Sequence, residues 1–361
     1  MILQGEARNG IEESIISERP SQDRWGTCRR VVGGKKGMMD ACRELVKSVV
    51  RVAVPADFRM AVFQGRQQIR QWPHDVSQWL YDRLPDAYVQ AAQFKQAHGR
   101  RLNFAAPATF NEKLHWLIRH HRDPVMTQLA DKYAVRDYVA ARLGSSFLND
   151  LYGVWDDPNA IPFDALPESY VLKVNHGSGQ NIFCRETARL NRPKIRAQLA
   201  QWLRRSEYWH SREWAYKDIP PRILCERLLS DEQGNVPADY KIFCFNGQPG
   251  MIQVDIDRFA EHQRDLFDSE WQPLPFSLEY PPTGQAIPRP ATLDVMLSAA
   301  KTLSQGFPFV RVDLYSIRER VIFGEMTWYP EGGLGHFMPE SADRALGDLL
   351  NLPAREQGRM S

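Results

Sequence analysis

Apolar and polar residues alternate near the end of the chain, in the segments FPFVRVDLYS and RVIFGEMTWYP. A period of two is typical of β-strands, in which successive side chains point to opposite faces of the sheet. The pattern places Arg311, Asp313 and Glu325 on one face of two strands, with Arg318-Glu319-Arg320 at the tip of the hairpin between them. Further strands are predicted beyond residue 151, in the segments YVLKVNH, NIFCRE, RILCERLL, DYKIFCF and GMIQVDID.

Apolar residues recur at helical spacing earlier in the chain. We expect helices over residues 56–102, where arginines flank an apolar stripe, and two helices over residues 108–144. The second region starts with a capping box formed by Thr109 and Glu112. Two further helical stretches interrupt the strands, at 192–205 and 291–305. This succession predicts an α+β or α/β domain built on antiparallel sheets.

The periodicity also predicts how the chain is divided. Residues 1–50 mix Glu, Ser, Arg and Gly without any period, so we expect a disordered N-terminal extension there. A helical accessory region follows at 51–104. No internal repeat occurs.

Composition narrows the class of protein. The chain has 361 residues, 43% of them hydrophobic and 25% charged, which is ordinary for a soluble protein with a sizeable core. Lysine and arginine total 46 against 44 acidic residues, so no overall positive field argues for a nucleic acid partner. Neither a long apolar run nor the order of a signal peptide occurs, so we expect no transmembrane segment and a cytoplasmic location. The oligomeric state is not indicated.

Several common chemistries lack their motifs. The five cysteines include no C-x-x-C pair, so we expect reduced, structural thiols. The segment GGKKG is incomplete as a phosphate-binding P-loop, and neither GxSxG nor GxGxxG after a strand occurs. His115, His120 and His121 do not have the HExxH spacing, and we interpret them as surface residues of a helix rather than as zinc ligands.

The charged residues of the predicted hairpin are the first candidates for function. Arg311, Asp313 and Glu325 on one half-buried face would be costly without another charged group beside them. Magnesium phosphate would satisfy all three, because Mg²⁺ takes hard oxygen ligands and arginine takes phosphate or carboxylate. The alternative is a surface hairpin with a structural Arg–Asp pair.

Two upstream strands could bind a nucleotide. Lys173 precedes the turn His176-Gly177-Ser178-Gly179, whose glycines could turn backbone N–H groups toward phosphate oxygens. A tight glycine hairpin is the alternative. Glu226 is the carboxylate in the otherwise apolar run ILCERLL, and with the backbone of Arg227 and Leu228 it has the form of an adenine-binding hinge.

The next two strands suggest two different functions. Asp239 and Lys241 share one face of DYKIFCF, and the lysine is another cation for phosphates. The strand GMIQVDID contains Asp255-Ile-Asp257, a DxD pair of the kind that binds Mn²⁺ or Mg²⁺ under a sugar diphosphate. A nucleotide-sugar glycosyltransferase is therefore the alternative function, although it leaves the glycine turn and the hairpin unexplained.

The order of these parts resembles the ATP-grasp ligases, which sandwich ATP between two α+β subdomains and activate a carboxylate as an acyl phosphate. More specifically, residues 105–340 resemble the TupA-like branch, named for teichuronopeptide biosynthesis and often found with polysaccharide gene sets. Six phrases carry the resemblance: FNEKLHW, DKYAVRDYV, YVLKVNHGSGQNI, EWAYKDIPPRI, DYKIFCFNG, and VRVDLY with FGEMTW. The fold it implies is an α+β ATP-grasp core at 105–340, preceded by a helical N-terminal region and followed by a C-terminal tail at 341–361.

The resemblance implies a set of nucleotide-binding residues. They are Lys132, Lys173, Gly177, Ser178, Gly179, Glu226, Leu228 and Asp239. The two lysines would hold the α- and β-phosphates, and the glycine turn would be a mobile lid. Glu226 and Leu228 would lie at the adenine.

The catalytic and metal-binding residues are implied in the same way. Lys241 would reach the γ-phosphate, and Arg311 would stabilise the acyl phosphate and the tetrahedral oxyanion. Asp313 and Glu325 would bind one or two Mg²⁺ ions. Thr327 stands where the wider superfamily usually has Asn, and its hydroxyl is a neutral oxygen ligand.

The implied activity is that of a carboxylate–amine ligase with ATP and Mg²⁺ as cofactors. Its substrates would be a small-molecule or glycan carboxylate and an amine, such as a uronic acid or amino sugar joined to an amino acid. Arg258 and His336 are substrate-binding candidates by their position alone. Trp214, His262 and Arg344 are weaker candidates on the same basis.

Overall fold

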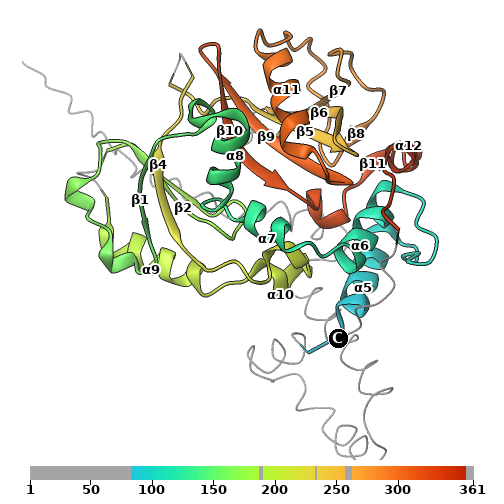
Figure 1. Cartoon of the computed structure of the whole chain (residues 1–361), viewed down its shortest axis with the longest axis horizontal. Helices are drawn as coiled ribbons and strands as arrows, with labels where there is room; N and C mark the ends of the chain where they lie inside the picture. Colours follow the sequence, from blue (N-terminus) through green and yellow to red (C-terminus); the bar gives the residue numbers. More distant parts are fainter. Residues whose placement is uncertain (1–82, 187–189, 232–233, 257–261, 355–361) are drawn as a thin grey trace, which may run out of the picture.

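Two antiparallel sheets organise the part of the chain that the computed structural model describes, residues 83–186, 190–231, 234–256 and 262–354 (Figure 1). The four-stranded sheet has the order β1-β4-β2-β3, and the five-stranded sheet has the order β10-β9-β5-β6-β7. Strands β8 (Ser277–Leu278) and β11 (Phe337–Met338) form a short ribbon. The predicted α+β class built on antiparallel sheets is confirmed.

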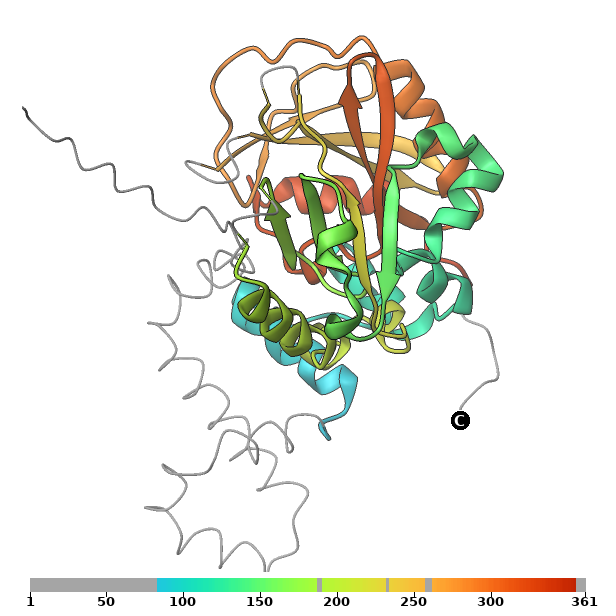
Figure 2. The same cartoon turned by 90° about the vertical axis from the view of Figure 1, so that its left-hand side faces the viewer.

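The smaller sheet consists of β1 (Leu151–Trp155), β2 (Tyr170–Val174), β3 (Asn181–Cys184) and β4 (Ile223–Arg227). Burial alternates along β2, so that Leu172 and Val174 are buried and Lys173 between them is not. The buried side chains share a core with helix α9 (Arg192–Leu203), which lies along this sheet (Figure 2). Lys173 therefore projects from the face opposite to α9.

The larger sheet consists of β5 (Asp239–Phe245), β6 (Gln248–Ile256), β7 (Gln263–Phe267), β9 (Phe309–Ile317) and β10 (Arg320–Thr327). Helix α11 (Leu293–Ser304) packs on one face, where Cys244 of β5 lies against the Ala300 carbonyl. On the other face, Phe243 and Phe245 of β5 contact Phe110 of a preceding helix. Apolar rings thus cover one end of that face, and its other end carries the charged residues described below.

The predicted hairpin of β9 and β10 is confirmed. Arg318 and Glu319 form its tip with φ angles of 47° and 64°, the left-handed values that a two-residue turn between twisted strands requires. Gly324 is an extra residue in β10, because the register shifts between Phe323 and Glu325. As a result Phe323 joins the apolar core while Glu325 faces Asp313 across the hairpin.

Helices precede and follow the sheets. Their bounds are α5 (Asp86–His98), α6 (Phe110–His120), α7 (Pro124–Ala130), α8 (Val135–Leu143), α10 (Glu207–Ser211) and α12 (Ser341–Leu349), with single 3-10 turns η2, η3, η4, η6 and η7 between elements. The capping box of Thr109 and Glu112 at the start of α6 is confirmed. The prediction of two helices over 108–144 is wrong, because Asp123 and Pro124 start a separate helix, α7.

One histidine was misplaced by the sequence pattern. His115 is buried, not on the helix surface, because it lies on the side of α6 that faces α5 and the loop at Gly333. His120 is exposed, as predicted. The three cysteines in the described parts are free and buried, and burial raises the pKa of Cys184 to about 11 and that of Cys244 to about 12. These thiols are structural.

The start of the predicted C-terminal tail is folded. Helix α12 packs on α6, where Lys113 Nζ donates 2.7 Å hydrogen bonds to the carbonyls of Gly347 and Leu350. Asp343 accepts a 2.9 Å hydrogen bond from the Asn111 backbone. Residues 341–350 therefore belong to the same core as α6, although the alternation of the sheets could not reveal this.

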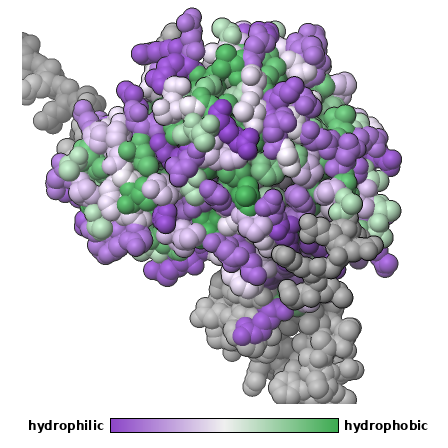
Figure 3. Space-filling view, in the orientation of Figure 1, coloured by the Kyte–Doolittle hydropathy of each residue, from purple (hydrophilic) through white to green (hydrophobic). Residues whose placement is uncertain are grey.

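The predicted N-terminal extension (1–50) and most of the predicted accessory region (51–82) lie outside the described residues. Within the residues that are described, no helix is both long and apolar enough to cross a membrane. On the side seen in Figure 3, apolar side chains are scattered among polar ones and form no broad patch. This side offers no extended apolar surface for a partner.

Candidate active site

The end of the larger sheet that lies away from Phe110 carries a row of polar side chains that crosses four strands. Register pairs Glu325 of β10 with Asp313 of β9, Asp313 with Lys241 of β5, and Lys241 with Gln253 of β6. Because directly paired residues lie on one face, the four side chains form a continuous line. We call it the polar row.

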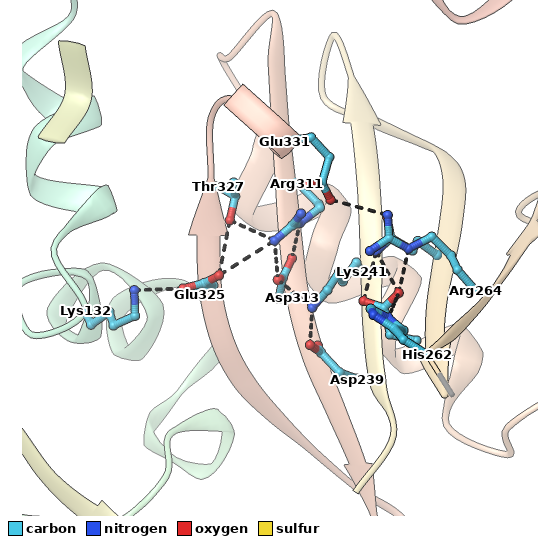
Figure 4. A network of polar contacts seen from close by, with 12 residues as sticks. Lys132, Asp239, Lys241, His262, Arg264, Arg311, Asp313, Glu325, Thr327 and Glu331 are labelled. Carbon is cyan, nitrogen blue, oxygen red and sulfur yellow. Dashed lines mark hydrogen bonds and ion pairs between the residues drawn. The ribbon is translucent and has the colours of Figure 1, made fainter. Parts of the chain in front are cut away.

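Arg311 lies at the centre of this region (Figure 4). Its guanidinium donates two 2.7 Å hydrogen bonds to the two oxygens of Asp313, and it lies 3.7 Å from Glu325 Oε1. It also donates to Thr327 Oγ1 at 3.2 Å. The structure thus brings together all four hairpin residues that the sequence singled out. Arg311 is only 7% exposed, and its two acidic neighbours raise its pKa although burial alone would lower it.

Lys241 lies between two carboxylates. Its Nζ contacts Asp239 on its own strand and lies 3.2 Å from Asp313 Oδ2. Burial raises the pKa of Asp313, against the opposing charges of Arg311 and Lys241. Asp239, Lys241, Asp313 and Arg311 are all buried, so their charges act on one another with little screening by water.

Lys132 connects the two sheets. It follows α7, and its Nζ lies 2.9 Å from Glu325 Oε2 and donates a 2.8 Å hydrogen bond to the Gly177 carbonyl in the turn after β2. Burial alone would raise the pKa of Glu325, but the charges of Lys132 and Arg311 hold this pKa well below its usual range. The ammonium group of Lys132, a predicted phosphate ligand, therefore contacts both the predicted lid and a predicted metal ligand.

Lys173 and Glu226 form a second ion pair, on the smaller sheet. Strands β2 and β4 are neighbours there, and Lys173 Nζ lies 2.8 Å from Glu226 Oε2. Arg136 approaches the same carboxylate at 3.6 Å, and Asn149 donates to it at 3.4 Å. The sequence gave these two residues separate roles, whereas here each is the other's partner. Leu228 follows the last residue of β4.

The two glycines of the turn are required for different reasons. Gly179 has a φ of 66°, so it needs the left-handed conformation that glycine adopts freely. The φ of Gly177 is not positive, and its constraint is steric, because a Cβ there would overlap the side chain of Gln180. Ser178 is exposed at the tip.

A further ion-pair network adjoins the polar row and was not found from the sequence. Arg264 of β7 donates a 2.6 Å hydrogen bond from Nε to Asp255 and lies 3.3 Å from Glu331 Oε1 (Figure 4). Gln253 also donates to both oxygens of Asp255, at 3.1 and 3.0 Å. The strand of Arg264, QRDLF, is too charged to be recognised by apolar alternation. We call Asp255, Arg264 and Glu331 the arginine network.

Residues 112–351 match the TupA-like ATPgrasp family, a stretch that covers more than half of the chain. The chain belongs to this family. Members of the ATP-grasp family are ATP-dependent ligases that form carbon–nitrogen bonds. The fold and family inferred from the sequence phrases are confirmed.

Solved structures with a similar fold are also ATP-grasp ligases. A D-alanine–D-alanine ligase from Bacillus anthracis is 16% identical, with 60% of this chain and 62% of that chain covered and a TM-score of 0.37. The complex of this ligase with ATP is 12% identical, with 55% of this chain and 53% of that chain covered and a TM-score of 0.33. The ATP-grasp ligase PsnB, in complex with a variant precursor, Mg and ADP, is 12% identical, with 63% of this chain and 59% of that chain covered and a TM-score of 0.35. This TupA-like chain thus spans about half to three fifths of their length. No similar sequence was found among curated proteins.

The donors of the hairpin are suited to a metal that arrives with phosphate. In phosphoryl-transfer sites Mg²⁺ is usually held by one or two carboxylates and by substrate phosphates. Asp313 and Glu325 face each other, and Thr327 Oγ1 lies 3.4 Å from Glu325 Oε1. Among the described residues no group of three or more His, Cys, Asp or Glu side chains could hold a metal unaided.

Other predicted site residues lie apart from the polar row or outside the described residues. The ring centroid of His336 lies 5.0 Å from that of His98, with the two planes tilted by 44°, and the His336 backbone N–H donates to Glu279. Arg258 and Asp257 are outside the described residues. Asp255 is committed to the arginine network, which weakens the DxD hypothesis.

The three weaker candidates have ordinary contacts. Trp214 packs against the apolar core, and Arg344 pairs with Asp348 on the surface of α12. His262 lies 3.3 Å from Asp255 and beside the ring of Tyr280.

Proposed function

We propose that this protein is an ATP-dependent carboxylate–amine ligase that acts through an acyl phosphate. A carboxylate oxygen would attack the γ-phosphorus of ATP, which releases ADP. The amine nitrogen would then attack the carbonyl carbon, and phosphate would leave as the amide forms. The observation that carries the proposal is the position of Arg311, in contact with Asp313 and 3.7 Å from Glu325 on one sheet face.

Arg311 is suited to stabilise the charge that develops in both steps. Its planar guanidinium can hold phosphate or carboxylate oxygens through two donors, and a buried cation is more effective than an exposed one. Asp313 and Glu325, with Thr327, would hold Mg²⁺, which would neutralise the phosphates when bound.

Three lysines would hold the triphosphate. Lys132 and Lys173 are partly exposed and would exchange their carboxylate partners for the α- and β-phosphates. Lys241 is buried and stays next to Asp239, from where it would reach the γ-phosphate. The glycine turn would close over the phosphates, and the end of β4 at Glu226 and Leu228 would hold the adenine.

No covalent nucleophile is required for this chemistry. In phosphoryl transfer the enzyme contributes position and charge neutralisation. The described thiols are buried, and burial raises the pKa of Cys225 to about 12, so they are poor nucleophiles. A site made of Lys, Arg and carboxylates agrees with this requirement.

The substrates would come from surface polysaccharide biosynthesis. The family resemblance favours a sugar acid or amino sugar joined to an amino acid. We propose that one partner offers the carboxylate and the other the amine.

A two-part assay tests the proposed function. The protein is incubated with ATP, Mg²⁺ and single carboxylates from a panel of uronic acids and amino acids, with hydroxylamine as a general trap for acyl phosphates. We expect ADP release and a hydroxamate with at least one carboxylate. Absence of both across the panel, together with tight binding of UDP-sugars and none of ATP, would overturn it in favour of the glycosyltransferase.

A further inference from the structure

Asn175 directly follows strand β2 and precedes the glycine turn, and its side chain is 0% exposed. Its Nδ2 donates 2.9 Å hydrogen bonds to Asp131 Oδ1 and to the Pro220 carbonyl, and its Oδ1 accepts a 2.7 Å hydrogen bond from the Arg222 backbone N–H. Asp131 and Pro220 lie 44 and 45 residues away from Asn175 in the sequence. A single buried amide therefore joins the root of the glycine turn to two distant segments.

The nitrogen and the oxygen of this amide can be assigned from its partners. The Arg222 backbone N–H is a donor and the Pro220 carbonyl is an acceptor, so exchange of the two amide atoms would leave both without a suitable partner. Asp131 is only 4% exposed, and a hydrogen bond to a buried carboxylate is stronger than one between neutral groups. The amide of Asn175 therefore has one orientation.

The segment around Asn175 also holds Lys132, the residue that follows Asp131. The Lys132 backbone N–H donates to the Asn175 carbonyl at 3.2 Å, and Lys132 Nζ donates to the Gly177 carbonyl at 2.8 Å. Asp131 Oδ1, which accepts from Asn175, also accepts a 2.8 Å hydrogen bond from the Tyr133 backbone N–H and so closes the turn that carries Lys132. Lys132 is thus fixed to residues 175–177 by its backbone, by its ammonium group and by the residue before it.

This attachment assigns Lys132 to the smaller sheet, although it precedes all four strands of that sheet in the sequence. Its ammonium group also lies 2.9 Å from Glu325 Oε2 on the larger sheet. A lysine side chain is long and flexible, so its ammonium group reaches a given ligand reliably when its backbone is held in place. Exchange of Glu325 for a phosphate would then require movement of the side chain while the backbone stays with the glycine turn.

We propose that Asn175, together with Asp131, is a positioning residue for the reaction. It holds Lys132 and the glycine turn as one unit, so that the ammonium group of Lys132 meets the nucleotide phosphates. This inference rests on the proposed function and adds two buried residues that act through Lys132 rather than on the nucleotide itself.

The first test measures the position of Lys132 without nucleotide. The full chain is treated briefly with an amine-modifying reagent, and the labelling rate of each lysine is measured by mass spectrometry. We expect Lys132 to be labelled about tenfold faster in Asn175→Ser, the scale of losing one hydrogen bond to a charged group. Lys194, an exposed residue of α9, should not change and is the internal control. An equal labelling rate of Lys132 in the parent and in Asn175→Ser would overturn the proposal.

The second test asks whether Asn175 affects ATP binding through Lys132. By calorimetry with ATP and Mg²⁺, Asn175→Ser should weaken binding about tenfold, whereas in a Lys132→Met background it should change binding less than about twofold. Asn111→Ser is the matched control, at another buried asparagine, whose Nδ2 donates to the Gly335 carbonyl. It should lower the unfolding temperature and leave ATP affinity unchanged. Additive losses in the double variant, or a lower unfolding temperature of Asn175→Ser with unchanged ATP affinity, would exclude a positioning role.

Asp131 offers a milder pair of variants if Asn175→Ser does not fold. Asp131→Asn keeps an acceptor oxygen for Asn175 and for the Tyr133 backbone, so Lys132 labelling and ATP affinity should stay close to the parental values. Asp131→Ala removes this acceptor and should reproduce the effects of Asn175→Ser. If the two Asp131 variants behave alike, the proposal is wrong.

The outcomes separate this proposal from the proposed function. If Lys132 labelling and ATP affinity change as expected while no carboxylate yields a hydroxamate, the positioning role stands and the ligase proposal falls. If a hydroxamate forms but Asn175→Ser leaves ATP affinity unchanged, the positioning role falls alone.

Discussion

The two sheets carry ion pairs of different kinds. On the smaller sheet, the partly exposed Lys173 pairs with the buried Glu226, and we expect this lysine to be released to another anion. On the larger sheet, Arg311 and Asp313 are buried and joined by two short hydrogen bonds, and each has further charged neighbours. A pair that can open is suited to binding, and a fixed buried group is suited to stabilising a transition state. We therefore expect the larger sheet to control turnover and the smaller sheet to control affinity for ATP.

The largest effect should follow loss of a carboxylate from the hairpin. Glu325→Gln and Asp313→Asn each remove a proposed metal ligand and a charge, so turnover should fall about a hundredfold or more. ADP release measured over a range of Mg²⁺ concentrations checks this.

Stability separates these two variants. Asp313→Asn leaves Arg311 buried without its main partner, a change that typically costs about 3–5 kcal/mol, whereas Glu325 is more exposed and Glu325→Gln should lower the unfolding temperature by less. Asp348→Asn, in an exposed pair with Arg344, is the control. A Glu325→Gln enzyme with more than half of the parental turnover would contradict the division between the sheets.

The next effect sharpens the comparison within the larger sheet. Arg311→Lys keeps the charge but loses the planar fork that contacts Asp313 through two donors. We expect ATP to bind with nearly unchanged affinity and hydroxamate formation to slow by about tenfold to a hundredfold. Calorimetry and the hydroxamate assay measure the two quantities separately. Equal losses in both would mean that Arg311 serves binding, like Lys173.

On the smaller sheet the effect should be on affinity. Lys173→Met removes a proposed phosphate contact and should weaken ATP binding by about tenfold or more, with a smaller change in turnover at saturating ATP. The control is Lys194→Met, an exposed lysine on α9. If turnover at saturation falls as far as in Glu325→Gln, the two sheets do not divide the work as we infer.

The smallest expected effect is on the pH dependence of stability, and it comes from residues outside both sheets. Burial lowers the pKa of His98 to about 4 and that of His115 to about 3, from the ordinary value of 6.5. The unfolded chain therefore takes up protons first as the pH falls, so these residues contribute stability above pH 6.5 that is lost progressively toward pH 4.

Thermal melts between pH 7 and pH 4 measure this loss. We expect a fall of several degrees that is smaller in His115→Leu and unchanged in His120→Gln, an exposed residue of the same helix. An identical fall in His115→Leu would exclude the histidine as its source.

Strand alternation predicted the fold class and most of the polar row. Arg311, Asp313, Glu325 and Thr327 could be assigned to one face because local geometry alone decides it. The pairing of Lys173 with Glu226 could not, because β4 lies between β1 and β2 in the sheet although it follows both in sequence. Which strands become neighbours is decided by tertiary packing.

Other misses have local physical causes. Arg264 lies in a strand whose charged residues hide its period, and Glu331 owes its position to a left-handed backbone that no side-chain pattern announces. His115 looked polar and was placed outside, yet neighbouring helices cover it. Polar residues that fill a site or a core run against the hydrophobic pattern, so the pattern is least informative where function is concentrated.

The balance of charge around the polar row determines what can enter it. Asp239, Asp313 and Glu325 are matched by Lys132, Lys241 and Arg311, so the formal charges cancel. A bare nucleotide would bring several negative charges toward three carboxylates, and a bare metal ion would arrive at one arginine and two lysines. The metal and the nucleotide would therefore enter together, because each reduces the electrostatic repulsion that the other meets. The two should bind with strong positive cooperativity.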